Sequence, residues 1–298
     1  NRLGKEEYLV DRMNYEAVQF IERNRKRPFF LYLSHYATHT ILNGKPSIVE
    51  KYRRKHPPGK STRKRCYLCQ DAGQQGDPGN HWAPDHNPHL AAMLESIDDG
   101  VGMILEKLKE LKLDHNTLVV FSSDNGGESQ VTSNAPMRGG KSSLYEGGIR
   151  VPLVVRWPAA VPAGKTCSTP TSNIDFYPTF LDAAGITPST EQKLDGHSIL
   201  AHLKEPGNRP RTTPLFWHYP LARPHFLGGH SGGAIRKGPW KLIEWFDTKK
   251  VELFNLQDDP SEKNNLFAQQ QETGNGLLAE LRAWRKELGA KTTVEEKK

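Results

Sequence analysis

The sequence has little cysteine and no long apolar run. Three cysteines in 298 residues are too few for a disulfide framework, and an odd number leaves at least one thiol without a cysteine partner. No segment approaches the roughly 18 apolar residues of a membrane span, so we expect none. The chain opens on Asn1 rather than Met, and no apolar run of the signal-peptide kind follows. We therefore expect a processed or truncated chain.

Composition and charge narrow the class of protein further. Hydrophobic residues make up 36% and aromatic residues 9% of the chain, which excludes wholesale disorder. The length suffices for about two domains of average size. Lys and Arg number 41 against 34 Asp and Glu, so the formal net charge is +7. Much of this excess lies in residues 51–65.

The first two thirds of the sequence alternate between helical and strand-like patterns. Apolar spacing predicts helices over residues 8–23, 90–111 and 175–184. Short apolar runs predict strands buried on both faces; they lie at 29–34, 117–121 and 151–157. Residues 40–89 have no sustained period and read as a long basic insertion or loop. The alternation predicts an α/β fold with a mostly parallel sheet flanked by helices.

The pattern changes after about residue 210. Four strand-like runs separated by turn residues predict an antiparallel sheet; they cover residues 215–219, 234–236, 240–246 and 252–256. A helical face through Leu277 and Leu281 follows, with Gly289 as its C-cap. We therefore divide the chain into an α/β domain over residues 1–209 and a smaller α+β domain over residues 210–298.

A candidate metal site follows the strand predicted at 117–121. Asp124 and Asn125 stand just beyond its carboxyl end, where open α/β sheets gather ligands. A carboxylate beside a carboxamide offers the hard oxygen ligands that Ca²⁺ or Mg²⁺ prefers. The alternative is a simple turn, because Asp, Asn and Gly favour turns for local reasons.

A candidate anion site lies in the glycine-rich loop of residues 137–142. Gly140-Lys141-Ser142 is similar to the end of a phosphate-binding loop, but Ala135 occupies the position of the first required glycine. A nucleotide site is therefore disfavoured. Lys141 remains either a point charge for an anion or a solvated lysine.

The basic insertion contains Cys66-x-x-Cys69 followed by two histidines. Pro84 lies between these histidines, where a zinc finger needs helix. We therefore expect no nucleic-acid binding. A disulfide, a local zinc clip and free thiols all remain open for Cys66 and Cys69.

His35 and His39 come directly after the strand predicted at 29–34. A histidine that leaves a strand tip toward a cleft serves as an acid, a base or an anion donor. Taken alone, such a histidine is as readily explained by packing or by a place on the surface.

In combination and order, these motifs closely resemble the type I, formylglycine-dependent sulfatases of the alkaline phosphatase superfamily. The segments that carry the resemblance over nearly the whole chain are residues 30–40, 123–126, 140–141, 145–152, 175–179, 195–196, 235–236, 240–242, 253–256 and 259–262. An ordered set of this kind is far more specific than any single motif.

The resemblance also identifies what this chain lacks. The family nucleophile lies in a Cys/Ser-x-Pro-x-Arg motif that follows a pair of metal-binding Asp residues, and the sequence has neither. Cys167-Ser168-Thr169-Pro170 does not fit, because no Arg follows as required. The chain is therefore similar to the carboxyl-terminal part of a sulfatase. The formylglycine is expected on the amino-terminal half, and this chain alone is expected to be inactive.

Roles for individual residues follow from the resemblance. Asp124 and Asn125 resemble the metal ligands of this half, with Ca²⁺ as the expected ion and Mg²⁺ as the alternative. Lys141 resembles the lysine that binds a sulfate oxygen, and His39 the histidine near the leaving group. Arg150 is a candidate substrate contact or, with Glu146, a residue that organises the loop.

The resemblance implies a sulfate ester, on a carbohydrate, as substrate, and an extracytoplasmic location. Arg63, Lys64 and Arg65 would then hold a sulfated glycan near the pocket mouth, and His218 and His225 are further candidates for substrate contact. The alternatives are a phosphodiesterase or phosphonate hydrolase of the same superfamily, and a non-catalytic module that binds sulfated glycans. The sequence leaves the oligomeric state open.

Overall fold

The computed structural model describes residues 7–39, 42–55, 87–129, 131–207 and 210–292. It divides the chain into two compact units. The first comprises Asn1–Thr117, Gln130–Ser133 and Trp157–Ala159, and the second comprises Leu118–Ser129, Asn134–Arg156 and Ala160–Lys298. The domain boundary predicted at residue 209 lies inside the second unit and stays a prediction.

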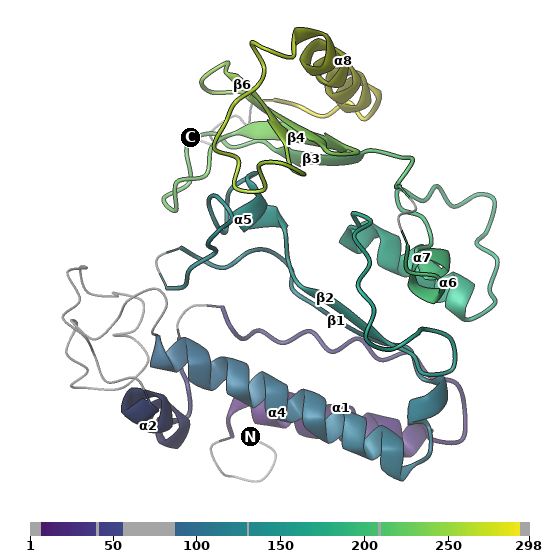
Figure 1. Cartoon of the computed structure of the whole chain (residues 1–298). Helices are drawn as coiled ribbons and strands as arrows, with labels where there is room; N and C mark the ends of the chain where they lie inside the picture. Colours follow the sequence, from purple (N-terminus) through teal and green to yellow (C-terminus); the bar gives the residue numbers. More distant parts are fainter. Residues whose placement is uncertain (1–6, 40–41, 56–86, 130, 208–209, 293–298) are drawn as a thin grey trace. The chain divides into compact units, whose positions relative to one another are not determined.

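The first unit is built around two helices that lie side by side (Figure 1). They are α1 (Leu9–Asn24) and α4 (Pro88–Glu110), and both confirm the helices predicted from apolar spacing. The Asn87 side chain caps α4 by accepting hydrogen bonds from the backbone amides of His89 and Leu90, both at 3.1 Å. No described helix has the length and apolar character to cross a membrane.

Part of the predicted loop over residues 40–89 is helical. Residues Pro46–Lys55 form α2, which packs against α4. The basic residues Arg53, Arg54 and Lys55 lie in its last turn, where their positive charges interact favourably with the negative end of the helix dipole. The sequence pattern did not predict α2, because this helix is rich in charged residues and buries only one side chain, that of Val49. Residues 56–86, which include Cys66 and Cys69, lie outside the described residues.

The contact between α1 and α4 depends on a glycine. Asn14 of α1 is buried and donates a hydrogen bond from Nδ2 to the Ser96 carbonyl at 2.9 Å. A Cβ atom added at Gly100 of α4 would overlap the Asn14 carboxamide. The glycine therefore allows the two helices to approach closely.

We expect Gly100→Ala to lower the free energy of unfolding by about 1–3 kcal/mol, because the buried contact must give way. Gly102→Ala is the matched control in the same helix, since its added Cβ would meet nothing within 4 Å. This control should raise stability by roughly 0.5–1 kcal/mol through helix propensity. Urea denaturation measures both changes, and shifts of the same sign and size would contradict the packing argument.

The prediction of a strand over residues 29–34 is wrong. This segment follows α1 in an extended conformation, but it forms no strand ladder with any described residue. Phe30 and Tyr32 are 67% and 80% exposed, whereas Leu31 between them is partly covered. A strand buried on both faces needs neighbours on both sides, and the described part of the chain supplies none.

The second unit contains a two-stranded sheet of β1 (Val119–Ser122) and β2 (Leu153–Arg156). Both strands lie where the apolar runs predict them, but they pair antiparallel, with Phe121 opposite Val154. The parallel arrangement expected for them is therefore wrong for this pair. A parallel connection needs a crossover, usually a helix, and the described residues between the two strands form only the four-residue helix α5 (Glu146–Ile149).

The same unit contains a four-stranded antiparallel sheet that confirms the prediction for the carboxyl-terminal region. Its strands, in spatial order, are β3 (Leu215–Tyr219), β4 (Gly232–Lys237), β5 (Trp240–Trp245) and β6 (Val251–Asn255). The predicted last helix is α8 (Gln271–Glu287), which covers one face of this sheet (Figure 1). Gly289 adopts a φ of 61° just past its end, as a C-cap requires.

The two faces of this sheet have separate cores. On one face, Leu242 and Leu253 pack against Leu277 and Leu281 of α8. On the other face, a second cluster joins sheet residues to Leu144, two positions after the glycine-rich loop; it consists of Leu144, Ala234, Ile243, Trp245, Phe254 and Leu256. The carboxyl-terminal sheet is thus packed directly onto the loop that carries Lys141.

The remaining helices of the unit are short. Residues Asn173–Asp175 form the 3₁₀ turn η2, and α6 (Phe176–Ala183) follows at once. Gly185, with a φ of 68°, ends α6 as predicted. The structure adds α7 (Leu200–Lys204) and the 3₁₀ turn η1 (Asp114–Asn116), which the sequence pattern did not indicate.

Candidate active site

The Asp124–Asn125 turn directly follows β1. The Asp124 side chain is exposed and that of Asn125 is half-buried. The Ser123 hydroxyl donates to the Asn125 carbonyl at 3.2 Å, and Asn125 Nδ2 donates to the Gly126 carbonyl at 2.8 Å. Because Nδ2 of the Asn125 side chain donates a hydrogen bond within the turn, Oδ1 is the atom of this side chain that can bind a cation.

The next two residues bind the turn to α5 and to the loop before it. The Gly126 amide donates to the Gly148 carbonyl at 2.9 Å, and a Cβ at Gly126 would overlap the Gly147 carbonyl. Gly127 exchanges two hydrogen bonds with the Asn134 carboxamide, at 3.0 Å and 2.7 Å. No side chain larger than hydrogen fits at Gly126, and this explains the glycine after Asn125.

Lys141, in the glycine-rich loop, is hydrogen-bonded through its backbone to the residues that follow the Asp124–Asn125 turn. Its backbone amide donates to the Gly127 carbonyl at 3.0 Å, and its side chain is half-buried. The structure therefore brings the loop of Lys141 against the turn of Asp124 and Asn125, although 17 positions separate Asp124 from Lys141 in the sequence (141 − 124 = 17).

Of the two histidines predicted in the carboxyl-terminal region, one lies in a loop beside Lys141. The His225 amide donates to the Gly229 carbonyl at 2.7 Å and closes this loop. A Cβ at Gly229 would overlap the Ser142 carbonyl, so the loop contacts the residue next to Lys141. His218 is used differently, because its Nε2 lies 2.8 Å from the Lys291 carbonyl oxygen and its ring packs on Phe246.

The first unit holds His39. This residue is exposed, its amide donates to the Tyr36 carbonyl at 3.0 Å, and its ring packs on the Tyr36 ring with 5.3 Å between centroids. Its predicted role near a leaving group stays a prediction. Arg63, Lys64, Arg65, Cys66 and Cys69 lie outside the described residues.

Glu146, at the start of α5, anchors the site loops in the carboxyl-terminal sheet. Glu146 Oε1 lies 3.0 Å from Nζ of Lys241 on β5, and both side chains are fully buried. Lys241 Nζ also lies 2.8 Å from Glu262 Oε1. Arg150, by contrast, is half-exposed and its guanidinium lies 3.9 Å from Glu146 Oε2. Arg150 therefore lies at the exposed edge of the loop.

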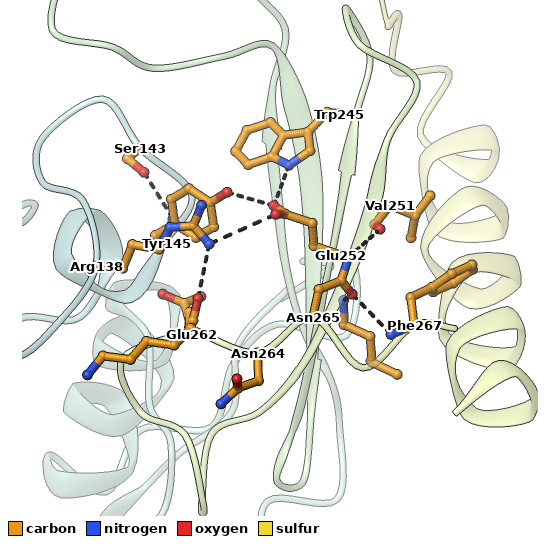
Figure 2. Close-up of polar contacts among 12 residues, drawn as sticks. Arg138, Ser143, Tyr145, Trp245, Val251, Glu252, Glu262, Asn264, Asn265 and Phe267 are labelled. Atoms are coloured by element: carbon orange, nitrogen blue, oxygen red, sulfur yellow. Dashed lines mark hydrogen bonds and ion pairs between the residues drawn. The ribbon is translucent and has the colours of Figure 1, made fainter. Parts of the chain in front are cut away.

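A second polar cluster, around Arg138 and Tyr145, joins the loop to the carboxyl-terminal sheet (Figure 2). The Arg138 guanidinium lies 3.9 Å from the centre of the Tyr145 ring and donates to the Glu262 carbonyl at 3.0 Å. The Tyr145 hydroxyl and Trp245 Nε1 both donate to Glu252 Oε2, at 2.6 Å and 2.7 Å. Burial and the neighbouring Glu252 carboxylate raise the pKa of Tyr145, so its hydroxyl stays a donor.

The donor set at Asp124 and Asn125 fits a hard divalent cation but does not complete a site. One carboxylate and one amide oxygen are two of the six to eight oxygens that Ca²⁺ takes. Among the described residues, no group of three or more His, Cys, Asp or Glu side chains is arranged to hold a metal ion. Further ligands would have to come from outside this set.

The roles of Lys241 and Glu262 were missed by reasoning from sequence. A signal for Lys241 did exist, because alternation along β5 places it on the same face as Ile243 and Trp245, both of which are buried. A lysine at a core-facing position needs a buried carboxylate. Nothing local indicated that Glu146 and Glu262 would supply two of them.

Comparison with known proteins assigns the family. The model of the Sulfatase family matches residues 2–186, and that of the family described as N-sulphoglucosamine sulphohydrolase, C-terminal, matches residues 140–287. The first match covers more than half of the chain. The chain therefore belongs to the sulfatase family, whose members have the alkaline phosphatase-like fold.

Individual relatives agree with this assignment. A sulfatase of Formosa agariphila is 31% identical over 307 residues, which cover 94% of this chain and 51% of the relative. An N-acetylglucosamine-6-O-sulfatase of Bacteroides thetaiotaomicron is 33% identical over 186 residues, covering 60% of this chain and 31% of the relative. The chain thus spans about half of the first relative and about a third of the second.

A solved structure extends the similarity to three dimensions. The crystal structure of Ps i-CgsB in complex with k-i-k-neocarrahexaose is 31% identical, with a TM-score of 0.76. The match covers 95% of this chain and 56% of that chain.

Proposed function

We propose that this protein is a sulfatase that hydrolyses a sulfate ester on a carbohydrate, and that Asp124, Asn125 and Lys141 are its contribution to the reaction centre. The observation that carries the proposal is the 3.0 Å hydrogen bond from the Lys141 amide to the Gly127 carbonyl. It joins the backbone of the loop that carries Lys141 to the residue two positions after Asn125, so the lysine and the two hard oxygen ligands belong to one hydrogen-bonded set of loops. Membership of the sulfatase family gives this pairing its chemical meaning.

In this proposal Lys141 binds a sulfate oxygen and stabilises negative charge on the sulfuryl group as the ester bond breaks. His39 belongs to the other unit, and its role as proton donor near the leaving oxygen rests on the family resemblance alone. Asp124 and Asn125 would hold Ca²⁺, with Mg²⁺ as the alternative, and the ion would supply further positive charge to stabilise the reacting group. The sequence has no Cys/Ser-x-Pro-x-Arg motif for a formylglycine.

A carbohydrate substrate is supported by the names of two similar proteins. One is an N-acetylglucosamine-6-O-sulfatase, and the other was crystallised with a neocarrahexaose. His225 is the better of the two histidine candidates for substrate contact, because its loop contacts Ser142. We infer an extracytoplasmic location from the family alone.

The test uses the complete gene product that carries this chain and a sulfated oligosaccharide. We expect release of inorganic sulfate, loss of this activity after dialysis against EDTA, and recovery with Ca²⁺. A phosphodiester and a phosphonate monoester serve as competing substrates. Preferential hydrolysis of either one would favour the phosphodiesterase or phosphonate hydrolase alternative. Tight glycan binding without hydrolysis would favour a non-catalytic module.

The 298-residue chain alone should release no sulfate from an aryl sulfate above the rate without protein. No segment of this sequence resembles the family nucleophile, and a positioned lysine cannot replace a nucleophile. A colorimetric assay with an aryl sulfate checks this, with the complete gene product as positive control. Metal-dependent, saturable turnover by the chain alone would refute the assignment of the nucleophile to another segment.

A further inference from the structure

A closed ring of buried charges lies between the glycine-rich loop and the carboxyl-terminal sheet. Lys241 Nζ lies 3.0 Å from Glu146 Oε1 and 2.8 Å from Glu262 Oε1. The other oxygen of Glu262 accepts a hydrogen bond from the Glu146 backbone amide at 2.6 Å. All three side chains are at most 2% exposed. Glu146 is therefore held by both its side chain and its backbone.

Glu146 begins α5, and this short helix is bonded to both parts of the candidate site. From α5, the Gly148 carbonyl accepts from Gly126, next to Asn125, at 2.9 Å. The Gly147 amide donates to the carbonyl of Arg138, three residues before Lys141, at 2.8 Å. The position of α5 thus sets the positions of the metal-ligand turn and of the Lys141 loop together.

Each carboxylate in this cluster faces at least one cation. Arg236 lies 3.8 Å and the half-exposed Arg150 3.9 Å from Glu146 Oε2, so Glu146 and Glu262 face Lys241 and two arginines. Burial lowers the pKa of Arg236 and raises that of Glu262, while Lys241 opposes the latter change. Burying charged groups is costly, and a buried ion pair seldom stabilises a fold more than apolar side chains of the same size would. Global stability is thus a poor explanation for the ring, whereas fixing one loop geometry is a sufficient one.

We propose that Lys241 is a positioning residue that acts through Glu146 and α5 to hold Asn125 and Lys141 at a fixed separation. Lys241 touches neither substrate nor metal in this proposal. The relevance of the separation for catalysis rests on the proposed function, but the positioning itself is a property of the chain and is tested without activity.

The experiment compares two double variants of the 298-residue chain by amide hydrogen exchange. Lys241→Met with Glu262→Gln removes one charge of each sign, and it leaves Glu146 with Arg236 and Arg150 as counterions. Lys237→Met with Glu280→Gln is the matched control, where the ion pair between β4 and α8 is 2.9 Å long and partly exposed.

In the Lys241 double variant, the amides of Gly126, Lys141 and Gly147 should exchange at least about tenfold faster than in the unmodified chain. The amides that pair β4 with β5 should stay within about twofold of their original rates, because the sheet keeps its own ladder. The control variant should leave both groups of amides unchanged.

Two results would overturn the proposal: unchanged exchange at the three loop amides, or equal acceleration of the loop and sheet amides, which indicates a merely structural role. Should the double variant fail to fold, Glu262→Gln keeps the side-chain volume and tests the same ring. Its loop amides should accelerate in the same selective way. If these results hold while the complete gene product hydrolyses no sulfate ester, the positioning role stands and the proposed function fails.

Discussion

Replacing Lys141 by alanine should lower kcat/KM of the complete gene product for a sulfate ester by about 10²–10³-fold. This is the loss typical of removing one group that stabilises charge in a transition state. Since the sulfate oxygens are already negative in the bound ester, the ammonium group stabilises the ground state to some extent and the transition state more, so KM should rise as kcat falls.

Lys165→Ala is the control for this variant. Lys165 lies in the same unit and is exposed, but it is far along the chain from the turn and loop that form the candidate site. Its removal should change kcat/KM by less than about twofold, within the range of a solvated charge. Equal losses in the two variants would show that Lys141 acts only through net charge or folding.

Replacing Arg211 by alanine should lower the free energy of unfolding by about 3–5 kcal/mol, because it leaves a buried charge without its counterion. Asp175 is fully buried and receives two hydrogen bonds from the Arg211 guanidinium, at 2.7 Å and 3.1 Å. The backbone amides of Ser172 and His197 donate to the same carboxylate, at 2.8 Å and 3.1 Å. Chemical denaturation at neutral pH measures the loss.

The loss of stability caused by Arg211→Ala should depend on pH, because it depends on the charge of Asp175. Burial alone would raise the pKa of Asp175, but the hydrogen bonds from Arg211, Ser172 and His197 outweigh it and lower the pKa. The carboxylate therefore contributes stability above its unfolded pKa, and this contribution is lost as pH falls through the lower, folded pKa. The difference between Arg211→Ala and the unmodified chain should shrink as pH falls, since Asp175 becomes neutral in both.

Lys193→Ala provides the contrast for Arg211→Ala. Lys193 pairs with Glu287 at 3.4 Å, but the two side chains are 77% and 69% exposed. An ion pair in such contact with water contributes less than about 1 kcal/mol. A comparable loss of stability in both variants would contradict the claim that burial makes the Asp175 pair important.

Those parts of the fold that depend on local periodicity were predictable from sequence. The apolar spacing of residues 90–111 predicts α4, and the alternation after residue 210 predicts all four strands of the carboxyl-terminal sheet. The run at 29–34 is as apolar as a buried strand, but strand formation needs a partner that no local pattern encodes. The same limit applies to the antiparallel pairing of β1 with β2.

The candidate site divides in the same way. The turn at Asp124 and the loop at Lys141 were identified from residue type and order, and the structure joins their backbones. The ring of Lys241, Glu146 and Glu262 was not identified, because its members are separated by 95 and 21 positions (241 − 146 and 262 − 241). Contacts at such separations follow from packing the sheet on the loop rather than from any motif.

The central claim is that Asp124, Asn125 and Lys141 converge on one sulfate and one divalent cation. It is tested most directly by a crystal structure of the complete gene product grown with Ca²⁺ and inorganic sulfate. We predict a cation at roughly 2.3–2.6 Å from oxygens of Asp124 and Asn125, with Lys141 Nζ at about 2.7–2.9 Å from a sulfate oxygen. A cation held by other residues, or a Lys141 ammonium out of hydrogen-bonding reach of the sulfate, would contradict it.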